Sequence, residues 1–182
     1  ELSKNALQAA QDFKRNNANK FVDKYLSKNT GDKLYFKSKF LSFDNLNEEE
    51  YEIKIWRPSF FKPLPPEKPF KYIILSFLYA LGLFRSKNYF LIELFNKDEE
   101  LMSSALIVPK FWKFKYMGKN DVQFIYVMVN EKFRGKNLAI HTIKESLAYL
   151  KEPVNKYWYV TNKSNVASVK TAKKVGFEIE NI

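Results

Sequence analysis

The sequence contains no cysteine and only one histidine, His141. The missing cysteines exclude disulfides, thiol nucleophiles and thiolate metal ligands. One imidazole is too few for a multi-histidine metal site. We therefore expect no metal cofactor and a reducing compartment. The chain does not open with a basic and then apolar segment of the kind that directs secretion, so the cytoplasm is the predicted location.

Glycine and long apolar runs are also scarce. The five glycines form neither GxGxxG nor GxxxxGK[ST], which excludes the two common glycine-rich phosphate motifs. The uncharged run over residues 72–84 is shorter than the roughly 20 residues that a membrane-spanning helix needs. This run therefore predicts a buried helix rather than a membrane span.

Arginine is rare for so basic a chain. The formal net charge is +11, yet nearly all of the 31 basic residues are lysines. Bidentate contacts to phosphates and bases favour arginine, so the composition argues against a nucleic-acid partner. The charge suits an anionic cofactor, an anionic substrate or a membrane surface, and does not choose among them.

Apolar residues make up 46% of the sequence, enough for the core of one domain spanning residues 1–182. The patterns predict an amphipathic helix over residues 2–26 and two strands over residues 33–43 and 51–57. A proline-rich excursion over residues 58–70 and a helix over residues 72–84 follow. They then predict three strands, over residues 88–94, 101–117 and 121–129, and a helix over residues 139–152. A strand over residues 156–160, a helix over residues 165–176 and a strand over residues 177–182 complete the chain. This order predicts an α/β fold with a mixed sheet and antiparallel hairpins.

The stretch VNEKFRGKNLA, residues 129–139, joins a predicted strand to a predicted helix. The first N–H groups of a helix have no intrahelical partner and carry a partial positive charge, so they bind anions such as a diphosphate. Gly135 allows close approach of the backbone, Asn137 tolerates a left-handed conformation, and Arg134 and Lys136 add charge. A solvated helix cap is the structural alternative.

Two motifs together resemble the GCN5-related N-acetyltransferase (GNAT) superfamily. VNEKFRGKNLA is similar to the strand-to-helix motif of that family, with Arg134, Asn137 and Ala139 in the matching positions. NVASVKTAKKVGF resembles its later Asn-x-x-Ser and Lys-x-Gly-Phe pattern. The matching residues of this second motif are Asn165, Ser168, Lys174, Gly176 and Phe177. The resemblance covers residues 88–182, which we expect to form an acetyl-CoA-binding core, and leaves residues 1–87 as a divergent N-terminal portion.

The resemblance implies a mostly antiparallel central sheet with two splayed strands, flanking helices and an N-terminal helical extension. It implies acetyl-CoA as the acyl donor, with the backbone of Val127, Met128 and Val129 beside the pantetheine. The diphosphate would bind the main-chain amides of Arg134, Gly135, Lys136, Asn137, Leu138 and Ala139. Asn165 and Ser168 would face the thiol end.

Two departures from the family pattern affect the catalytic residues. Ala172 stands where many members have a tyrosine that protonates the leaving thiolate, and Gln123 stands where some have a glutamate base. Ser168 and Asp121 are therefore weak catalytic candidates, with a helix-surface serine and a turn-forming aspartate as alternatives. The further candidates for a base are Glu93, Tyr126 and His141.

We expect an acetyl-CoA-dependent N-acetyltransferase that acts on a small-molecule amine, for example an amino sugar. The alternatives are a protein or peptide N-acetyltransferase and a catalytically silent CoA-binding or structural module. Contact of residues 60–84 with a membrane surface, through Lys62, Lys68 and Lys71, is less favoured than a core helix.

The sequence leaves six residues after Gly176. That is too short for the seventh strand usual in the family, so we expect a lost tail or a second copy, in a homodimer, to complete the sheet.

Overall fold

The computed structural model describes residues 32–43, 50–58, 76–79, 81–82, 84, 86–111 and 114–181. The helix predicted over residues 2–26 lies outside this part of the chain. So do most of the proline-rich excursion and the three lysines invoked for membrane contact.

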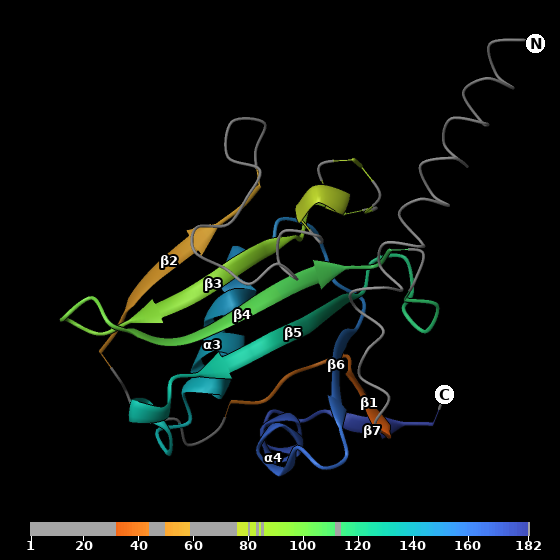
Figure 1. The fold of residues 1–182 in the computed structure, drawn as a ribbon. Helices are drawn as coiled ribbons and strands as arrows, with labels where there is room; N and C mark the ends of the chain where they lie inside the picture. The colour runs from red at the N-terminus through yellow and green to blue at the C-terminus, as the bar shows by residue number, and fades with distance from the viewer. Residues whose placement is uncertain are drawn as a thin grey trace, which may run out of the picture.

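A seven-stranded sheet forms the centre of the fold (Figure 1). Its strands are β1 (Lys33–Ser38), β2 (Glu52–Trp56), β3 (Phe90–Phe95), β4 (Leu101–Pro109), β5 (Val122–Val129), β6 (Tyr157–Asn162) and β7 (Glu178–Glu180). They lie in the order β2-β3-β4-β5-β6-β1-β7. Only β5 and β6 are parallel, and the other neighbours are antiparallel. The predicted mixed, mostly antiparallel sheet is confirmed.

Helical segments follow β5 and β6. They are η1 (Glu131–Phe133), α3 (Leu138–Ser146), η2 (Leu147–Tyr149) and α4 (Val166–Lys174). The helix predicted over residues 139–152 extends too far, because α3 ends at Ser146 and a 3-10 turn follows. The strand predicted over residues 101–117 also extends too far, because β4 ends at Pro109 and proline lacks the N–H that a longer ladder needs.

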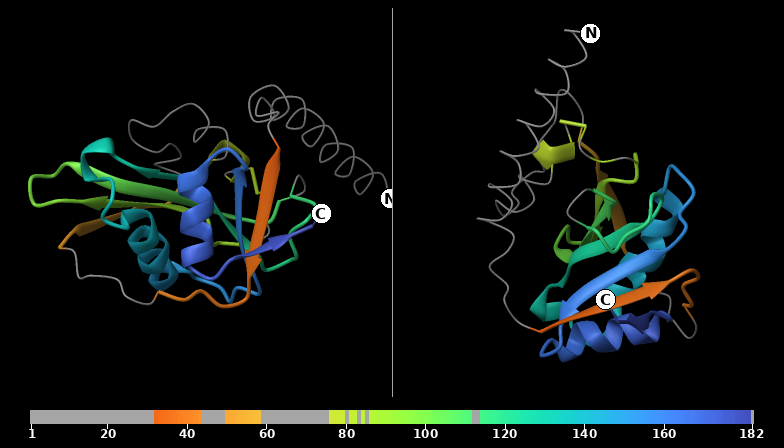
Figure 2. Two further views of the ribbon diagram at one scale, coloured as in Figure 1. Left: turned by 90° about the horizontal axis from the view of Figure 1, so that it is seen from below. Right: turned by 90° about the vertical axis from the view of Figure 1, so that its right-hand side faces the viewer.

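Apolar side chains pack on both faces of the sheet. On one face, α3 and α4 lie close together (Figure 2) and bury Ile143 and Val175 against Phe90 and Phe124. On the other face, Leu91 joins an aromatic cluster that consists of Leu78, Phe84, Tyr89, Leu91, Leu106, Val108 and Phe111. Successive strand residues point to opposite faces, so a strand buried on both sides is a continuous apolar run. This explains the uninterrupted pattern of β3.

Strand β1 lies between β6 and β7 in the sheet, a position that the sequence did not predict. It pairs with β6 along its whole length and with β7 through Tyr35, Phe36 and Lys37. The sheet thus obtains seven strands within one chain. The expectation that a lost tail or a second copy must complete it is wrong, because an earlier strand returns to lie between the last two.

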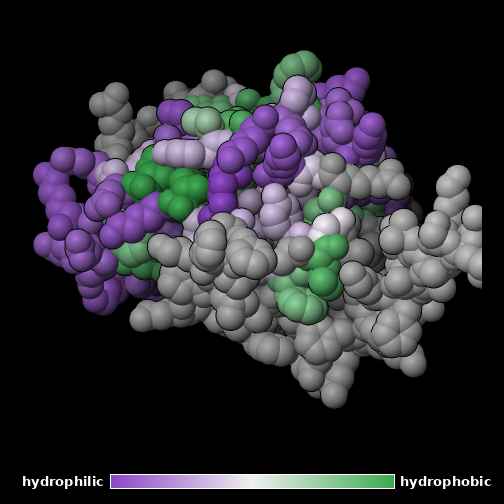
Figure 3. Space-filling view, turned by 90° about the horizontal axis from the view of Figure 1, so that it is seen from above, coloured by the Kyte–Doolittle hydropathy of each residue, from purple (hydrophilic) through white to green (hydrophobic). Residues whose placement is uncertain are grey.

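Among the described residues, six large apolar side chains are exposed, and of these Phe77 and Leu81 lie in one helical turn. The six are Phe40, Phe77, Leu81, Met128, Val166 and Ile179. Seen from above, hydrophobic patches are interrupted by hydrophilic surface (Figure 3). Among the described residues, no helix has the length and hydropathy needed to cross a bilayer.

Phe36, inside β1, and Phe40, two residues after its end, test how far the fold depends on this strand. Phe36 is fully buried in the core, whereas Phe40 is 85% exposed. We expect Phe36→Ala to lower the free energy of unfolding by about 3–5 kcal/mol. Phe40→Ala, the matched control, should change it by less than about 0.5 kcal/mol. Urea denaturation measures both; equal losses would show that burial of β1 is not what stabilises the sheet.

Candidate functional site

The parallel strands β5 and β6 separate after a short paired section. They pair at Val122, Gln123 and Phe124, opposite residues 157–159. Within residues 114–181, all of which the structure describes, no later residues of these strands pair with each other. β5 continues along β4, and β6 continues along β1 (Figure 1). The splayed strands that the resemblance implies are therefore present.

A β-bulge lies in β5 just beyond the paired section. The register with β4 shifts between Ser104 and Leu106, and Tyr126 has a φ of 50°. Ile125 and Tyr126 consequently pack on the same face of the sheet, against the aromatic cluster. A bulge redirects side chains in this way and bends its strand. Burial raises the pKa of Tyr126 to about 12, so its hydroxyl stays protonated at neutral pH and cannot act as a base.

The end of β5 is fixed to β4. The Ser103 Oγ donates to the Met128 carbonyl at 2.9 Å, and the Asn130 N–H donates to Met102 at 2.9 Å. A trans peptide is planar and its N–H points opposite to its C=O. The Val129 N–H, which shares a peptide plane with the Met128 carbonyl, therefore points away from β4, toward the gap.

The loop after β5 has the conformation that its residue types predict. Gly135 has a φ of 90°, and Asn137 at the N-cap of α3 has a φ of 56°. The predicted left-handed conformation of Asn137 is confirmed. Residues 134–137 are exposed, and a Cβ placed on Gly135 would meet no described atom within 4 Å. The start of α3 is thus open to an anion.

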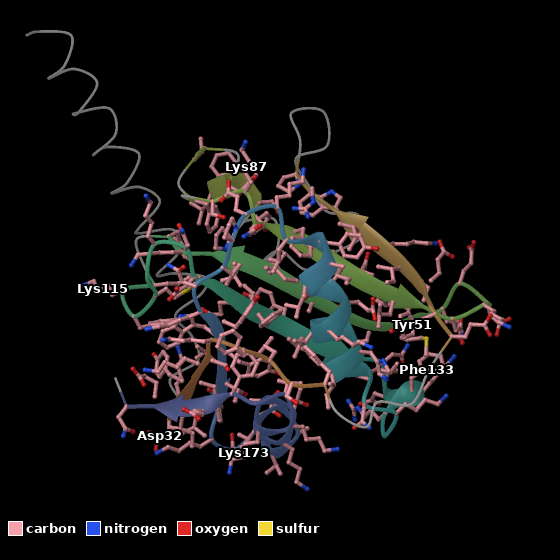
Figure 4. All side chains as sticks on the ribbon, turned by 180° about the vertical axis from the view of Figure 1, so that it is seen from behind. Asp32, Tyr51, Lys87, Lys115, Phe133 and Lys173 are labelled. Atoms are coloured by element: carbon pink, nitrogen blue, oxygen red, sulfur yellow. The ribbon has the colours of Figure 1, made fainter. Side chains whose placement is uncertain are left out.

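Cations surround this loop. Lys174, in the last turn of α4, donates to the Asn137 Oδ1 at 3.1 Å and so joins the end of α4 to the start of α3. Arg134 forms an ion pair of 2.8 Å with Glu131, and both side chains are well exposed. Exposed pairs of this kind contribute little, so Arg134 can exchange Glu131 for a phosphate at small cost. Figure 4 shows Phe133 beside this loop and Lys173 on α4.

Asn165 and Ser168 form the N-terminal cap of α4. The Asn165 side chain accepts from the Ser168 N–H at 3.1 Å. Burial raises the pKa of Tyr159, and a hydrogen bond from the Ser168 side chain opposes that shift. Tyr159 is the last residue of β6 opposite β5, so Ser168 lies near the point where the strands separate. Ala172 is fully buried in the core.

Asp121 has a structural role at the start of β5. Its carboxylate accepts from the Gly118 N–H and from the Trp158 Nε1, each at 2.7 Å. It is 2% exposed. Next to it, the Gln123 Oε1 accepts from the Tyr116 hydroxyl at 2.6 Å. These contacts form a buried network that fixes the paired section of the two strands.

His141 belongs to a different part of the molecule. Its Nδ1 lies 3.4 Å from the hydroxyl of Tyr51, which donates to Glu145 at 3.0 Å. Burial, followed by the hydrogen bond to Glu145, raises the pKa of Tyr51. Tyr51 immediately precedes the edge strand β2 and lies beside α3 (Figure 4). Because β3, β4 and β5 separate β2 from β6, His141 faces away from the gap.

Glu93 is a buried carboxylate on the face opposite α3. It lies two residues after Leu91 in β3, hence on the same face, and is 8% exposed. It pairs with Ser104 of β4, which in turn pairs with Met128 of β5. Glu93 is thus level with the end of β5 and close to the bulge. In the sequence it was one polar residue in an apolar strand, and strand alternation alone indicated its face.

Among the described residues, no group of three or more histidine, aspartate or glutamate side chains is arranged to hold a metal ion.

Comparison with known families fits this geometry. A family model described as "Acetyltransferase (GNAT) family" matches residues 50–177. The chain therefore belongs to the GNAT acetyltransferase family. This confirms the predicted family and the predicted fold. The matched range begins well before the two motifs on which the resemblance was based. A search of curated proteins finds no match.

Several solved structures are similar to this chain at low sequence identity. The aminoglycoside antibiotic 6'-N-acetyltransferase AAC(6')-Ih from Acinetobacter baumannii is 10% identical, with a TM-score of 0.51, over 73% of this chain and 95% of that one. A GCN5-related N-acetyltransferase from Sphaerobacter thermophilus is 13% identical, with a TM-score of 0.48, over 82% of this chain.

A functionally unknown conserved protein from Staphylococcus epidermidis ATCC 12228 is 8% identical, with a TM-score of 0.46, over 82% of this chain. The chain spans 58% of the Staphylococcus protein and 49% of the Sphaerobacter one.

The left-handed residue at the start of α3 can be tested by two substitutions that both remove the contact with Lys174. Asn137→Gly keeps the conformation without strain, whereas Asn137→Val forces a β-branched residue to a positive φ. We expect the valine variant to be less stable than the glycine variant by about 1–2 kcal/mol. Thermal unfolding measures the difference. Equal stability of the two variants would contradict the left-handed assignment.

Proposed function

We propose that this GNAT protein is an acetyl-CoA-dependent N-acetyltransferase that transfers the acetyl group to the amine of a small molecule. The observation that carries this proposal is the parting of β5 from β6 directly beside the open start of α3. A gap between strands accepts an extended arm, and a helix start accepts a diphosphate. The two lie next to each other, as an acyl-CoA requires.

The cofactor would be held mainly by main-chain groups. In this proposal the pantetheine lies along Val127, Met128 and Val129. The diphosphate is held by the amides of Arg134, Gly135, Lys136, Asn137, Leu138 and Ala139. The Met128 carbonyl is already hydrogen-bonded to Ser103, so the Val129 N–H is the donor directed at the gap. A donor there would stabilise negative charge on the thioester carbonyl oxygen.

The acceptor would approach from the face opposite α3 and α4, because these helices cover the other face beside the gap. We propose that Glu93 removes the proton from the acceptor amine. It is the candidate carboxylate that lies on this face and near the bulge. Asp121 is less suited because it lies just before the start of β5, away from the bulge, where its carboxylate holds Gly118 and Trp158 in place.

Acetyl-CoA supplies the activated thioester when bound. The amine nitrogen would form the new bond to the acetyl carbon and lose a proton to Glu93, while the carbon–sulfur bond would break. Ser168 is the candidate for donating a proton to the leaving thiolate, because it lies at the first turn of α4 near the point of separation. Its hydroxyl would regain a proton from solvent, which in turn receives the one released by Glu93. Asn165 would fix Ser168 through the cap.

Two alternatives keep the same fold. A protein or peptide acceptor is compatible with the Asn-x-x-Ser motif, while the similarity to an aminoglycoside acetyltransferase agrees with a small amine, such as an amino sugar. A silent CoA-binding module is favoured by the buried Ala172 and by Gln123, which replace the acid and base of other members.

A cytoplasmic location and the absence of a nucleic-acid partner are part of the same proposal.

Acetyl-CoA binding is the first test. At a hundredfold excess over its dissociation constant, acetyl-CoA should stabilise the protein by about 2.7 kcal/mol, seen as a rise in Tm. Acetyl-pantetheine, which lacks the diphosphate, should give a much smaller rise at the same concentration. Release of the CoA thiol over a panel of small amines and peptides then separates the acceptors. A folded protein with no rise in Tm would refute the proposal.

The role of Glu93 is tested by an isosteric change. We expect Glu93→Gln to lower kcat about 100-fold or more, because an amide cannot accept the proton. The KM for acetyl-CoA should not change. Glu52→Gln on β2, an exposed carboxylate, is the matched control and should leave kcat unaltered. A Glu93→Gln variant with the kcat of the parent protein would remove Glu93 from the mechanism.

A further inference from the structure

Two buried hydroxyl groups connect the two halves of the proposed cofactor site. Thr142 of α3 lies with its Oγ1 2.7 Å from the Ser103 Oγ of β4. The Ser103 hydroxyl donates to the Met128 carbonyl of β5 at 2.9 Å. The Thr142 Oγ1 also lies 2.8 Å from the Leu138 carbonyl, in the first turn of its own helix. Its single hydrogen can be donated either to this carbonyl or to Ser103, and the link to the sheet forms when Ser103 accepts it. Thr142 and Ser103 are at most 1% exposed.

Each end of the link from Thr142 through Ser103 to Met128 lies beside a group that the proposed function uses. At one end, Leu138 is the first residue of α3, whose opening N–H groups would hold the diphosphate. At the other end, the Met128 carbonyl shares its peptide plane with the Val129 N–H. A rotation of that plane would move the Val129 N–H away from the gap.

The remaining contacts of α3 with the sheet are mostly apolar. Ile140 and Ile143 pack into the core that α3 shares with the sheet. Apolar packing is not directional, so it resists a small slide or rotation of a helix less sharply than a hydrogen bond of fixed geometry. Buried hydroxyls also require their partners, which holds this arrangement in place.

We propose that Ser103 and Thr142 are positioning residues that hold the start of α3 in register with the end of β5. They touch neither the diphosphate nor the pantetheine in this proposal. They fix the distance and direction between the amides at the helix start and the Val129 N–H, so that one ligand meets both. The inference rests on the proposed function, and it adds residues that neither motif contains.

The chain offers a matched control. Ser146 lies one turn beyond Thr142, is fully buried, and donates to the Ile143 carbonyl at 2.6 Å within the same helix. Its hydroxyl forms no hydrogen bond with the described residues of β4 or β5, so its loss removes a buried hydroxyl of α3 without cutting the link to the sheet. Thr142→Ser retains the hydroxyl and is the conservative variant.

The experiment measures CoA binding by calorimetry and the Tm without ligand for each variant. We expect Thr142→Val and Ser103→Ala to raise the Kd for CoA about three- to tenfold, the effect of losing one hydrogen bond. Thr142→Ser should bind nearly as the parent protein does. Ser146→Ala should lose a similar amount of Tm and keep the parent Kd.

The outcomes separate the two proposals. If the parent protein binds CoA and both Thr142→Val and Ser103→Ala bind it equally well, the positioning role is refuted while the proposed function stands. An equal rise in Kd for Ser146→Ala would also refute it, because loss of stability would then explain the weaker binding. A folded parent protein that binds no CoA would overturn both proposals. Ser103→Ala decides the matter should Thr142→Val not fold.

Discussion

The parting of β5 from β6 is the constraint on which the rest of the site depends. A strand in the middle of a sheet normally satisfies its main-chain groups on both sides, and leaving such groups without a partner costs free energy. Here the pairing of β5 with β6 ends at Phe124, and the bulge at Tyr126 bends β5. The remaining connections of β5 run to β4, with Ser103 and Asn130 among them, and they fix the end of the strand where its other side is open.

The open side is useful because the chain places a second feature beside it. The loop from Arg134 to Asn137 ends with a left-handed residue, and this directs the first turn of α3 toward the gap. Lys174 contacts Asn137 from the end of α4, so the end of α4 and the start of α3 meet at one loop. Positive charge, exposed N–H groups and an unpaired strand edge thus occur within a short distance, although they come from three elements.

Much of this arrangement followed from local sequence. Alternation predicted the strands, and the glycine and asparagine of the loop predicted its backbone conformation correctly, because each of these properties is decided by neighbouring residues. The position of β1 could not be predicted in the same way. Its partner strands lie more than a hundred residues later, and nothing in the sequence KLYFKS specifies which edge it joins.

The same distinction applies to individual site residues. The role of Asp121 depends on Trp158, and the contact between Ser103 and Thr142 depends on how α3 crosses the sheet. Serine and threonine in these positions carry no periodic pattern of their own. Glu93 was visible as a charged residue in an apolar strand, but its relation to the end of β5 required the register of three strands.

The insertion of β1 between β6 and β7 has a consequence for how the protein folds. A strand near the beginning of the chain pairs only with the last two strands, so closing the sheet brings together segments that are synthesised far apart in time. Such non-local pairings slow folding, because a long loop must be ordered before the contact forms. During synthesis both edges of β1 stay unpaired until β6 and β7 have been made, and unpaired strand edges favour aggregation with other chains. We infer that this stage, rather than assembly of β3, β4 and β5, limits how quickly the newly made chain reaches its finished fold.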